Sequence, residues 1–436
     1  MMINRKRVWL MALALAAACL LGGCSAPSSA ESLFTLPQLP IEYNDLSRQI
    51  NDLIANGYEY ASPTSGRNIQ SVQMVDLDGD GDEEAVAFFR RSSDEKALKI
   101  FIFSANNGAY EQLCTIESSG TAVDSVNYQD LTGDGRLELV VGWRISTDVQ
   151  TVATYIVQKE PAVLMQSSYV RYSIEELDGD GVPSLLLFRL DDEGNSVAEF
   201  YSWRDEVMAV TYSANLTGTM AELARGSVVS GRLDSDHSAV FVTGVTDEAM
   251  AATDILTYRS GAGLTNVAVD PQTGSSGVVF PYMQLRPQDI DGDGIVEVPA
   301  PQVNGEGQLT GIVDWLAYDG EGQNVLVMTT YHNLAGGWYF ILPEEWRGRA
   351  AVRNADSGVN ELQAILSLDG REVGVIYTLS GENRENRALR GNRQVIKRQT
   401  GTTYAGEILP AGEAWGLTDD LLRQNFKLIG SQWTTG

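Results

Sequence analysis

Short apolar runs separated by polar turns dominate the chain from residue 69 to about residue 340. The runs are rich in β-branched and aromatic residues and are shorter than ordinary helices, so they predict strands. The predicted strands include Ala85–Phe89, Lys99–Phe103, Tyr110–Ile116, Leu139–Trp143, Thr151–Val157 and Ala162–Gln166. We therefore predict a mainly β protein.

An acidic loop precedes five of the apolar runs, and four of the five copies contain glycines. The clearest copy spans Asp76–Glu84, and related copies begin at Asp130, Glu176, Arg232 and Asp289, so the starts lie 54, 46, 56 and 57 residues apart. Each interval has room for about four short strands. The spacing therefore predicts a repeated unit of four strands.

Oxygen-bearing side chains at positions 1, 3, 5 and 9 of these loops, with glycines that allow a tight backbone, are typical of a Ca²⁺ site. Without a cation, the carboxylates between residues 76 and 84 would repel one another. The predicted metal-binding residues of the first, second and fifth loops, position 7 included, are Asp76, Asp78, Asp80, Asp82 and Glu84, then Asp130, Thr132, Asp134, Arg136 and Glu138, then Asp289, Asp291, Asp293, Ile295 and Glu297.

The copies differ in how well they suit a cation. Thr132 replaces an acid in the second loop and weakens that site. The third loop offers Glu176, Asp178 and Asp180, but Pro183 and Ser184 at positions 8 and 9 disfavour binding. In the fourth loop Arg232 replaces the first ligand, which predicts no site.

The loops also match the beginning of an EF-hand signature. An EF-hand needs a carboxylate at position 12 and flanking helices. Position 12 is Ala87, Val141 or Ala300 here, and predicted strands follow. This alternative is excluded, whereas a set of solvated acidic turns without metal stays open.

The pattern Asp-x-Asp-Gly-Asp-Gly-x-x-Glu-apolar resembles the FG-GAP/VCBS family of β-propeller repeats over residues 69–335. The resemblance implies a propeller of about five, and between five and seven, four-stranded blades. It also implies structural Ca²⁺ ions in the acidic loops.

The beginning of the chain predicts export. Basic residues 5–7 precede an apolar run from Val8 to Leu21, which is typical of a secretory signal. Leu21-Gly-Gly-Cys24 resembles a bacterial lipobox, which implies cleavage before Cys24, lipidation of Cys24 and anchoring on the extracytoplasmic face of the bacterial cell membrane. An ordinary signal peptide cut nearby is the alternative. Residues 1–23 are thus the predicted signal and residues 24–40, rich in Ser and Pro, a tether.

The rest of the chain is divided into two predicted domains. Residues 41–337 would hold an N-terminal helix, which Gly57 ends, and the propeller. Residues 338–436 would form a small α+β domain, with strands at Gln363–Leu368, Val373–Leu379 and Gln394–Lys397 and a helix capped by Thr418. Its opening segment, residues 338–346, weakly resembles modules of other bacterial surface lipoproteins.

Charge limits the choice of partner. The chain has 58 acidic against 31 basic residues, a net charge of −27, which excludes nucleic acid and favours cations or basic surfaces. Residues 384–398 oppose this trend with six basic side chains. They predict either a solvated, mobile face or a docking surface for an anionic polymer or for the protein's own acidic loops.

No combination of residues predicts catalysis. His237 and His332 lack the spacing of a triad or a zinc site. Cys114 is the remaining thiol once Cys19 leaves with the signal and Cys24 is lipidated, and its alternating surroundings predict a buried hydrophobe. We expect a binding or scaffolding module for a protein or polysaccharide at the cell envelope. The alternatives are a glycan lyase or hydrolase and a spacer that presents the C-terminal domain.

Overall fold

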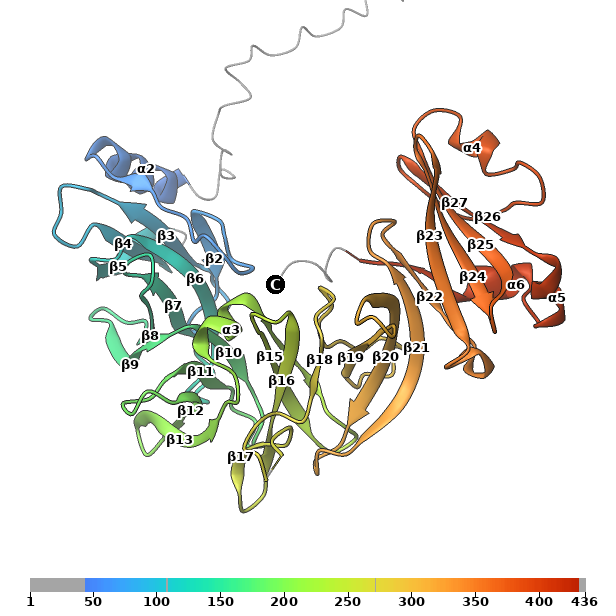
Figure 1. The fold of residues 1–436 in the computed structure, drawn as a ribbon. Helices are drawn as coiled ribbons and strands as arrows, with labels where there is room; N and C mark the ends of the chain where they lie inside the picture. The colour runs from blue at the N-terminus through green and yellow to red at the C-terminus, as the bar shows by residue number, and fades with distance from the viewer. Residues whose placement is uncertain (1–43, 107–108, 271, 431–436) are drawn as a thin grey trace, which may run out of the picture. The chain divides into compact units, whose positions relative to one another are not determined.

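The computed structural model describes residues 44–106, 109–270 and 272–430. These residues form six antiparallel sheets of four or five strands, with a few short helices between them (Figure 1). The prediction of a mainly β protein is confirmed. The predicted signal peptide, Cys24 and the tether lie outside the described residues. No described helix is long and apolar enough to cross a membrane.

Four sheets follow one another along the chain. The first contains β1 (Glu59–Tyr60), β2 (Val72–Val75), β3 (Glu84–Arg90), β4 (Leu98–Asn106) and β5 (Ala109–Ser118). The second contains β6 (Ala122–Gln129), β7 (Glu138–Arg144), β8 (Gln150–Ile156) and β9 (Ala162–Tyr169). The third contains β10 (Arg171–Glu175), β11 (Ser184–Leu190), β12 (Ser196–Arg204) and β13 (Val207–Asn215). After α3 (Met220–Arg225), the fourth contains β14 (Ser227–Arg232), β15 (Ser238–Val245), β16 (Met250–Arg259), β17 (Gly263–Asn266) and β18 (Val279–Pro281).

The last two sheets are interleaved in sequence. The fifth contains β19 (Glu297–Val303), β20 (Leu309–Tyr318), β21 (Asn324–Asn333), β22 (Trp338–Ile341) and β28 (Phe426–Leu428). The sixth contains β23 (Ala350–Gly358), β24 (Glu361–Leu368), β25 (Arg371–Ser380), β26 (Gln394–Gln399) and β27 (Thr402–Ile408). Short helices accompany the sixth sheet, namely the 3-10 helix Glu344–Trp346, α4 (Arg384–Arg387), α5 (Pro410–Ala414) and α6 (Asp419–Asn425).

Consecutive sheets pack face to face, which explains why the second strands are apolar without alternation. In β11, Leu185 and Leu187 pack against the second sheet, while Leu186 and Phe188 pack against the fourth. Successive side chains of a strand point to opposite faces, so a strand covered on both faces needs an unbroken apolar run. Similar buried clusters join the first sheet to the second, the fourth to the fifth and the fifth to the sixth.

Helix α2 (Asn44–Ala55) belongs to a compact unit with the end of β4 and the start of β5. Leu46 and Ile50 of this helix are buried, and the side-chain amide of Gln49 donates to the carbonyl of Tyr110. Gly57, with a φ of 85°, follows the end of the helix. The predicted N-terminal helix is therefore present.

The predicted domain boundary at residue 338 falls inside the fifth sheet. Residues 338–341 pair with β21. They also pair with β28, which follows the strands of the sixth sheet in the sequence. Trp338 and Phe340 are fully buried, so the apolar run predicted to open a second domain instead completes the fifth sheet. The three predicted strands of the C-terminal region and the helix after Thr418 are present, and the Thr418 hydroxyl accepts from the backbone N–H of Leu421.

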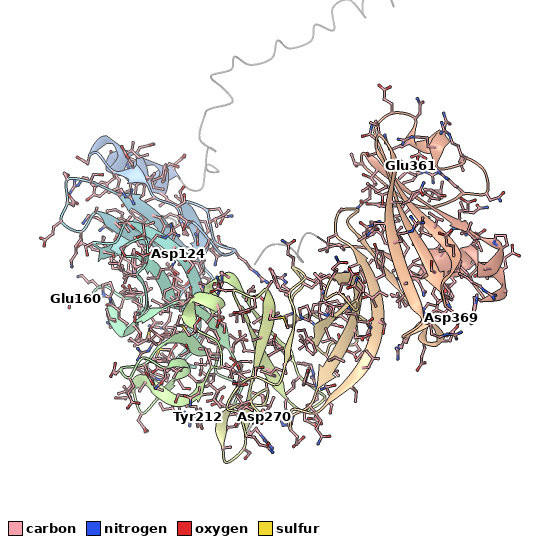
Figure 2. All side chains as sticks on the ribbon, in the orientation of Figure 1. Asp124, Glu160, Tyr212, Asp270, Glu361 and Asp369 are labelled. Carbon is pink, nitrogen blue, oxygen red and sulfur yellow. The ribbon has the colours of Figure 1, made fainter. Side chains whose placement is uncertain are left out.

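Internal contacts hold the basic segment 384–398 onto the sixth sheet. The guanidinium groups of Arg387 and Arg393 lie 3.7 and 2.9 Å from the carboxylate of Glu361 (Figure 2). The Arg393 guanidinium also lies 3.6 Å from the ring centroid of Tyr377, a cation–π contact. These arginines are part of the packed structure of the sheet rather than of a mobile face.

Candidate metal centres in the acidic loops

Each acidic loop joins two paired antiparallel strands, which are called the first and second strands of the sheet. In the first sheet these are β2 and β3, and the two-residue β1 is not counted. The first four loops follow β2, β6, β10 and β14. In the fifth sheet the first strand is reduced to a bridge between Gln288 and Glu297. The repeat spacing in the sequence thus reflects one acidic loop at the same place in each of five sheets.

The carboxylate at position 1 organises the loop backbone. In the first loop, Asp76 Oδ1 accepts from the N–H of Gly79 at 2.8 Å and Oδ2 from the N–H of Gly81 at 3.1 Å. Both glycines have positive φ, 75° and 94°, a backbone conformation that side chains disfavour. Asp130 and Asp289 make the same pair of bonds in the second and fifth loops.

The glutamate at position 9 is the first residue of the second strand and is buried. Glu84, Glu138 and Glu297 each accept, through Oε2, the backbone N–H of the second loop residue at 2.8–3.0 Å. Burial, and secondarily the nearby aspartates, raises the pKa of all three carboxyl groups, that of Glu297 to about 7. A carboxylate in such surroundings favours either a proton or a cation.

The first and fifth loops bring their carboxylates together as predicted. One oxygen from each of Asp76, Asp78 and Glu84 lies within 4.8 Å of the others, and Asp289, Asp291 and Glu297 form the matching group in the fifth loop. Glu297 has no exposed surface, and its Oε1 has no hydrogen-bond partner among the described residues. Because a buried, unpaired carboxylate oxygen is unfavourable, the fifth loop fits a hard cation.

The remaining predicted residues of these two loops serve the turn backbone. Asp80 and Asp293 each accept the N–H two residues later, from Asp82 and Ile295, at 2.8 Å. Their carboxylates therefore hold the turn in shape. Asp82 and Ile295 contribute a backbone donor to this arrangement.

The second loop satisfies its buried glutamate from within. The Thr132 hydroxyl donates to Glu138 Oε1 at 3.4 Å, and the Thr132 N–H donates to Oε2 at 3.2 Å. Asp134 accepts the N–H of Arg136 at 2.9 Å. Threonine at position 3 thus supplies a hydroxyl donor in place of a third carboxylate, so this loop has less need of a cation.

In the third loop an arginine lies where a cation would be expected. Nη2 of Arg204, the last residue of β12, lies 2.8 Å from Asp178 Oδ2 and 3.9 Å from Asp180 Oδ2. Glu176, Asp178 and Asp180 do converge, but the guanidinium already supplies positive charge. Ser184, at position 9, bonds to Ser202 instead of facing the loop. Asp178 Oδ1 is buried without a hydrogen-bond partner among the described residues, so the third loop still offers a carboxylate oxygen, but a cation there would compete with the guanidinium of Arg204.

The fourth loop is closed by its own residues. The Asp234 carboxylate contacts Nδ1 of His237 at 2.9 Å and accepts backbone N–H groups of Asp236, His237 and Gly320. Arg232 donates to the carbonyls of Asp234 and Ser235. These bonds occupy the carboxylate oxygens of Asp234.

Backbone hydrogen bonds connect some neighbouring loops. The N–H of Leu137 in the second loop donates to the carbonyl of Leu77 in the first at 2.8 Å, and the N–H of Val296 in the fifth donates to Arg232 at 2.9 Å. The third loop has Pro183 at the equivalent position, and proline has no N–H to donate. The order of one loop therefore depends in part on its neighbour.

Arg204 could not have been identified from the loop sequences. It follows Asp178 by 26 residues, on a strand whose pattern shows only β structure. His332 is buried. It lies in β21, stacked on Tyr339, and burial lowers its pKa to about 3.

A polar cavity lies along β6, β10 and β14. Its volume is about 790 Å³, and it is lined by residues of β6, β10, β14 and the segment 65–68. The carboxylate that lines it belongs to Asp124 (Figure 2), which pairs with Arg144 at 2.5 Å. This is a second place at which the fold could hold a ligand.

Comparison with known proteins assigns no family. No family model matches the chain, and no curated protein matches it. Some solved structures are weakly similar to this chain over most of its length. A protein described as a 6-phosphogluconolactonase from Bacteroides fragilis is 12% identical with a TM-score of 0.27, and the match covers 73% of this chain and 81% of that one.

Two glycosidases are similar to a comparable degree. The exo-β-1,3-galactanase of Phanerochaete chrysosporium is 10% identical with a TM-score of 0.25 and coverages of 78% and 82%. The endo-1,5-α-L-arabinanase of Thermotoga petrophila is 11% identical with a TM-score of 0.23 and coverages of 80% and 99%. Similarity of this degree assigns neither activity nor ligand.

Proposed function

We propose that this protein is a calcium-stabilised binding module of the bacterial cell envelope, anchored through a lipid on Cys24. The observation that carries the calcium proposal is Glu297, a fully buried carboxylate with an unpaired oxygen, grouped with Asp289 and Asp291. A group of three closely spaced carboxylates suits Ca²⁺ better than it suits transition metals. The first loop, which groups Asp76, Asp78 and the buried Glu84 in the same way, is the second proposed site.

The proposed role of the ions is structural. Each site ties the first strand of a sheet to its second, through a loop whose backbone the aspartates already shape. We further propose that the sheets are blades of a β-propeller, five to seven in number. The support for this is the serial face-to-face packing of four- and five-stranded antiparallel sheets with one acidic loop in each of five.

Calcium removal tests the proposal directly. The metal-stripped protein should melt at a lower temperature, and Ca²⁺ should raise the melting temperature more than Mg²⁺ does, because a ligand of the folded state stabilises it. The pKa of Glu297 is about 7, and metal binding displaces that proton. The calcium effect should therefore be larger above pH 7 than below it.

Matched variants locate the effect. Asp78→Ala and Asp291→Ala should each reduce the calcium response, whereas Asp270→Ala, which removes an exposed aspartate outside the loops, should leave it intact. A melting temperature that does not respond to Ca²⁺ would show that the loops are acidic turns and nothing more.

Lipidation rests on the sequence around Cys24 and is tested separately. Membrane fractions of cells grown with labelled palmitate should contain the labelled protein, and Cys24→Ser should release an unlabelled form. A labelled Cys24→Ser protein would place the anchor elsewhere.

The lining of the polar cavity favours binding over catalysis. A hydrolase of the usual kind positions two carboxylates across the scissile bond. Asp124 is the carboxylate among the residues lining the cavity, and Arg144 already compensates its charge. We therefore favour a binding role, with a polysaccharide or a protein of the envelope as the partner.

A further inference from the structure

Three arginines line one cavity at the beginning of the first strands. The cavity has a volume of about 390 Å³, and its lining includes Arg171 of β10, Arg225 of α3 and Arg286, which follows β18. No aspartate or glutamate is among the residues that line it. In a chain with 58 acidic and 31 basic residues, a cavity lined by guanidinium groups without carboxylates is a local reversal of charge.

Arg171 is held in place by groups that do not neutralise it. Its guanidinium donates to the carbonyls of Leu223, Ala224 and Gly226 at 3.2–3.3 Å, at the C-terminal end of α3. Carbonyl oxygens orient a guanidinium group and carry only partial charge. Burial lowers the pKa of Arg171, as expected for a cation that has lost water without gaining a counter-ion.

Arg225 is compensated only at the surface. It pairs at 2.7 Å with Asp247, whose side chain is 85% exposed. An ion pair in such a position is weak and screened by salt. An anion in the cavity would compete with Asp247 for this arginine at little cost.

The backbone of the cavity wall is strained at one residue. Gln284, which lines the cavity, has a φ of 51°. A residue that is neither glycine nor asparagine is uncommon in this region, and such conformations gather at binding sites. The strain holds the segment before Arg286 in a defined conformation.

A larger polar cavity adjoins this one. The 790 Å³ cavity shares Arg171 and Ser227 with it, and its lining continues with hydroxyl, phenol and amide groups such as those of Tyr172, Asn127 and Gln129. Groups of this kind bind the hydroxyls of a sugar, and a cavity of this size admits a small ligand. The two cavities together offer three guanidinium groups beside a polar surface on which the lining carboxylate, that of Asp124, is paired with Arg144.

We propose that the two cavities bind an acidic saccharide, with its anionic group at Arg171, Arg225 and Arg286 and its hydroxyls along the adjoining polar surface. Guanidinium groups suit carboxylate, sulfate and phosphate alike. The proposal deepens the binding function proposed above and rests on it. The acidic loops follow the end of β10 opposite to Arg171, and the five residues of β10 separate the two ends by about 17 Å. The anionic group at the arginines and the cations in the loops would therefore bind apart.

Calorimetric titration of the calcium-loaded, dialysed protein tests this inference. The probes are trigalacturonate, a sulfated heparin disaccharide and maltotriose, which carry a carboxylate, a sulfate and no charge. We expect at least one acidic probe to bind and to weaken as salt rises, while maltotriose does not bind. The acidic probe that binds better identifies the anionic group.

Variants locate the site. Arg286→Gln and Arg225→Gln should each weaken binding about tenfold, the size expected for one charge-assisted hydrogen bond. Arg259→Gln removes another exposed arginine of an ion pair, 3.4 Å from Glu321 and outside both cavities, and should leave binding unchanged. All three variants should keep the wild-type melting temperature, so that lost binding is not lost folding.

The contrary results are equally specific. No binding of either acidic probe, equal binding of maltotriose, or equal weakening by Arg259→Gln would overturn the inference. A calcium-responsive protein that binds no acidic probe overturns this inference alone. A protein that binds an acidic probe and ignores Ca²⁺ overturns the calcium proposal alone.

Discussion

Asp178 and Asp291 occupy the same position in their loops but face different partners. Asp291 lies with Asp289 and the buried Glu297, where negative charge accumulates. Asp178 lies against the guanidinium of Arg204 at 2.8 Å. A single side chain from the end of a neighbouring strand thus supplies to the third loop the positive charge that the fifth loop lacks.

Removing that arginine should make the third loop dependent on metal. In Arg204→Gln, Asp178, whose side chain is 3% exposed, keeps its charge without a counter-ion, so the metal-free protein should lose about 1–2 kcal/mol of unfolding free energy. This figure is discounted for the partial exposure of Arg204. Ca²⁺ should restore part of the loss. Denaturant unfolding with and without Ca²⁺ measures both effects.

The control for this prediction is Arg259→Gln, which removes an exposed ion pair between the last residue of β16 and Glu321. It should change stability by no more than about 0.5 kcal/mol. An Arg204→Gln protein as stable as the wild type without metal would mean that the guanidinium does not compensate the loop.

At the scale of elements, one very short strand contacts two sheets. Strand β28 is three residues long, yet its Phe426 packs on Trp338 of the fifth sheet and Tyr404 of the sixth, with ring centroids 5.3 and 5.1 Å apart. Phe426 is buried in the cluster that joins the two sheets. The side chain of Phe426 therefore contacts aromatic residues of both sheets.

Phe426→Ala should destabilise the protein by about 3 kcal/mol, because it opens a cavity in a packed aromatic cluster. Far-ultraviolet circular dichroism during denaturant unfolding gives the stability, and tryptophan fluorescence reports the aromatic cluster. The control Val359→Ala changes a side chain that is 88% exposed and should be nearly neutral. A neutral Phe426→Ala would remove β28 from the account of how the two sheets are held together.

The elements show which part of the fold could be predicted from the sequence. Second strands such as β11 stand out because both of their faces are buried. First strands such as β10 are half-exposed along their length and leave little trace. Helix α3 was missed although Thr219 and Glu222 form a capping box, a pattern that does predict a helix start.

At the scale of the whole molecule, contacts between residues close in sequence could be predicted, whereas contacts between residues far apart in sequence could not. Within the first loop, and likewise within the fifth, the acidic residues are close together in the sequence, so their convergence could be predicted. The Arg204–Asp178 pair and the arginine cavity join residues from separate strands, and no periodicity links them. Residue 338, the predicted boundary, is the first residue of β22, and the pairing of β22 with β28 joins two segments that the sixth sheet separates in the sequence.

That pairing makes the sixth sheet an insertion between two strands of the fifth. During synthesis, β22 emerges long before residues 426–428, and its outer edge keeps unpaired backbone groups until they arrive. Such an edge is a template for aggregation and a target for quality control. A product truncated anywhere within the sixth sheet would lack β28 and would leave this edge of β22 unpaired.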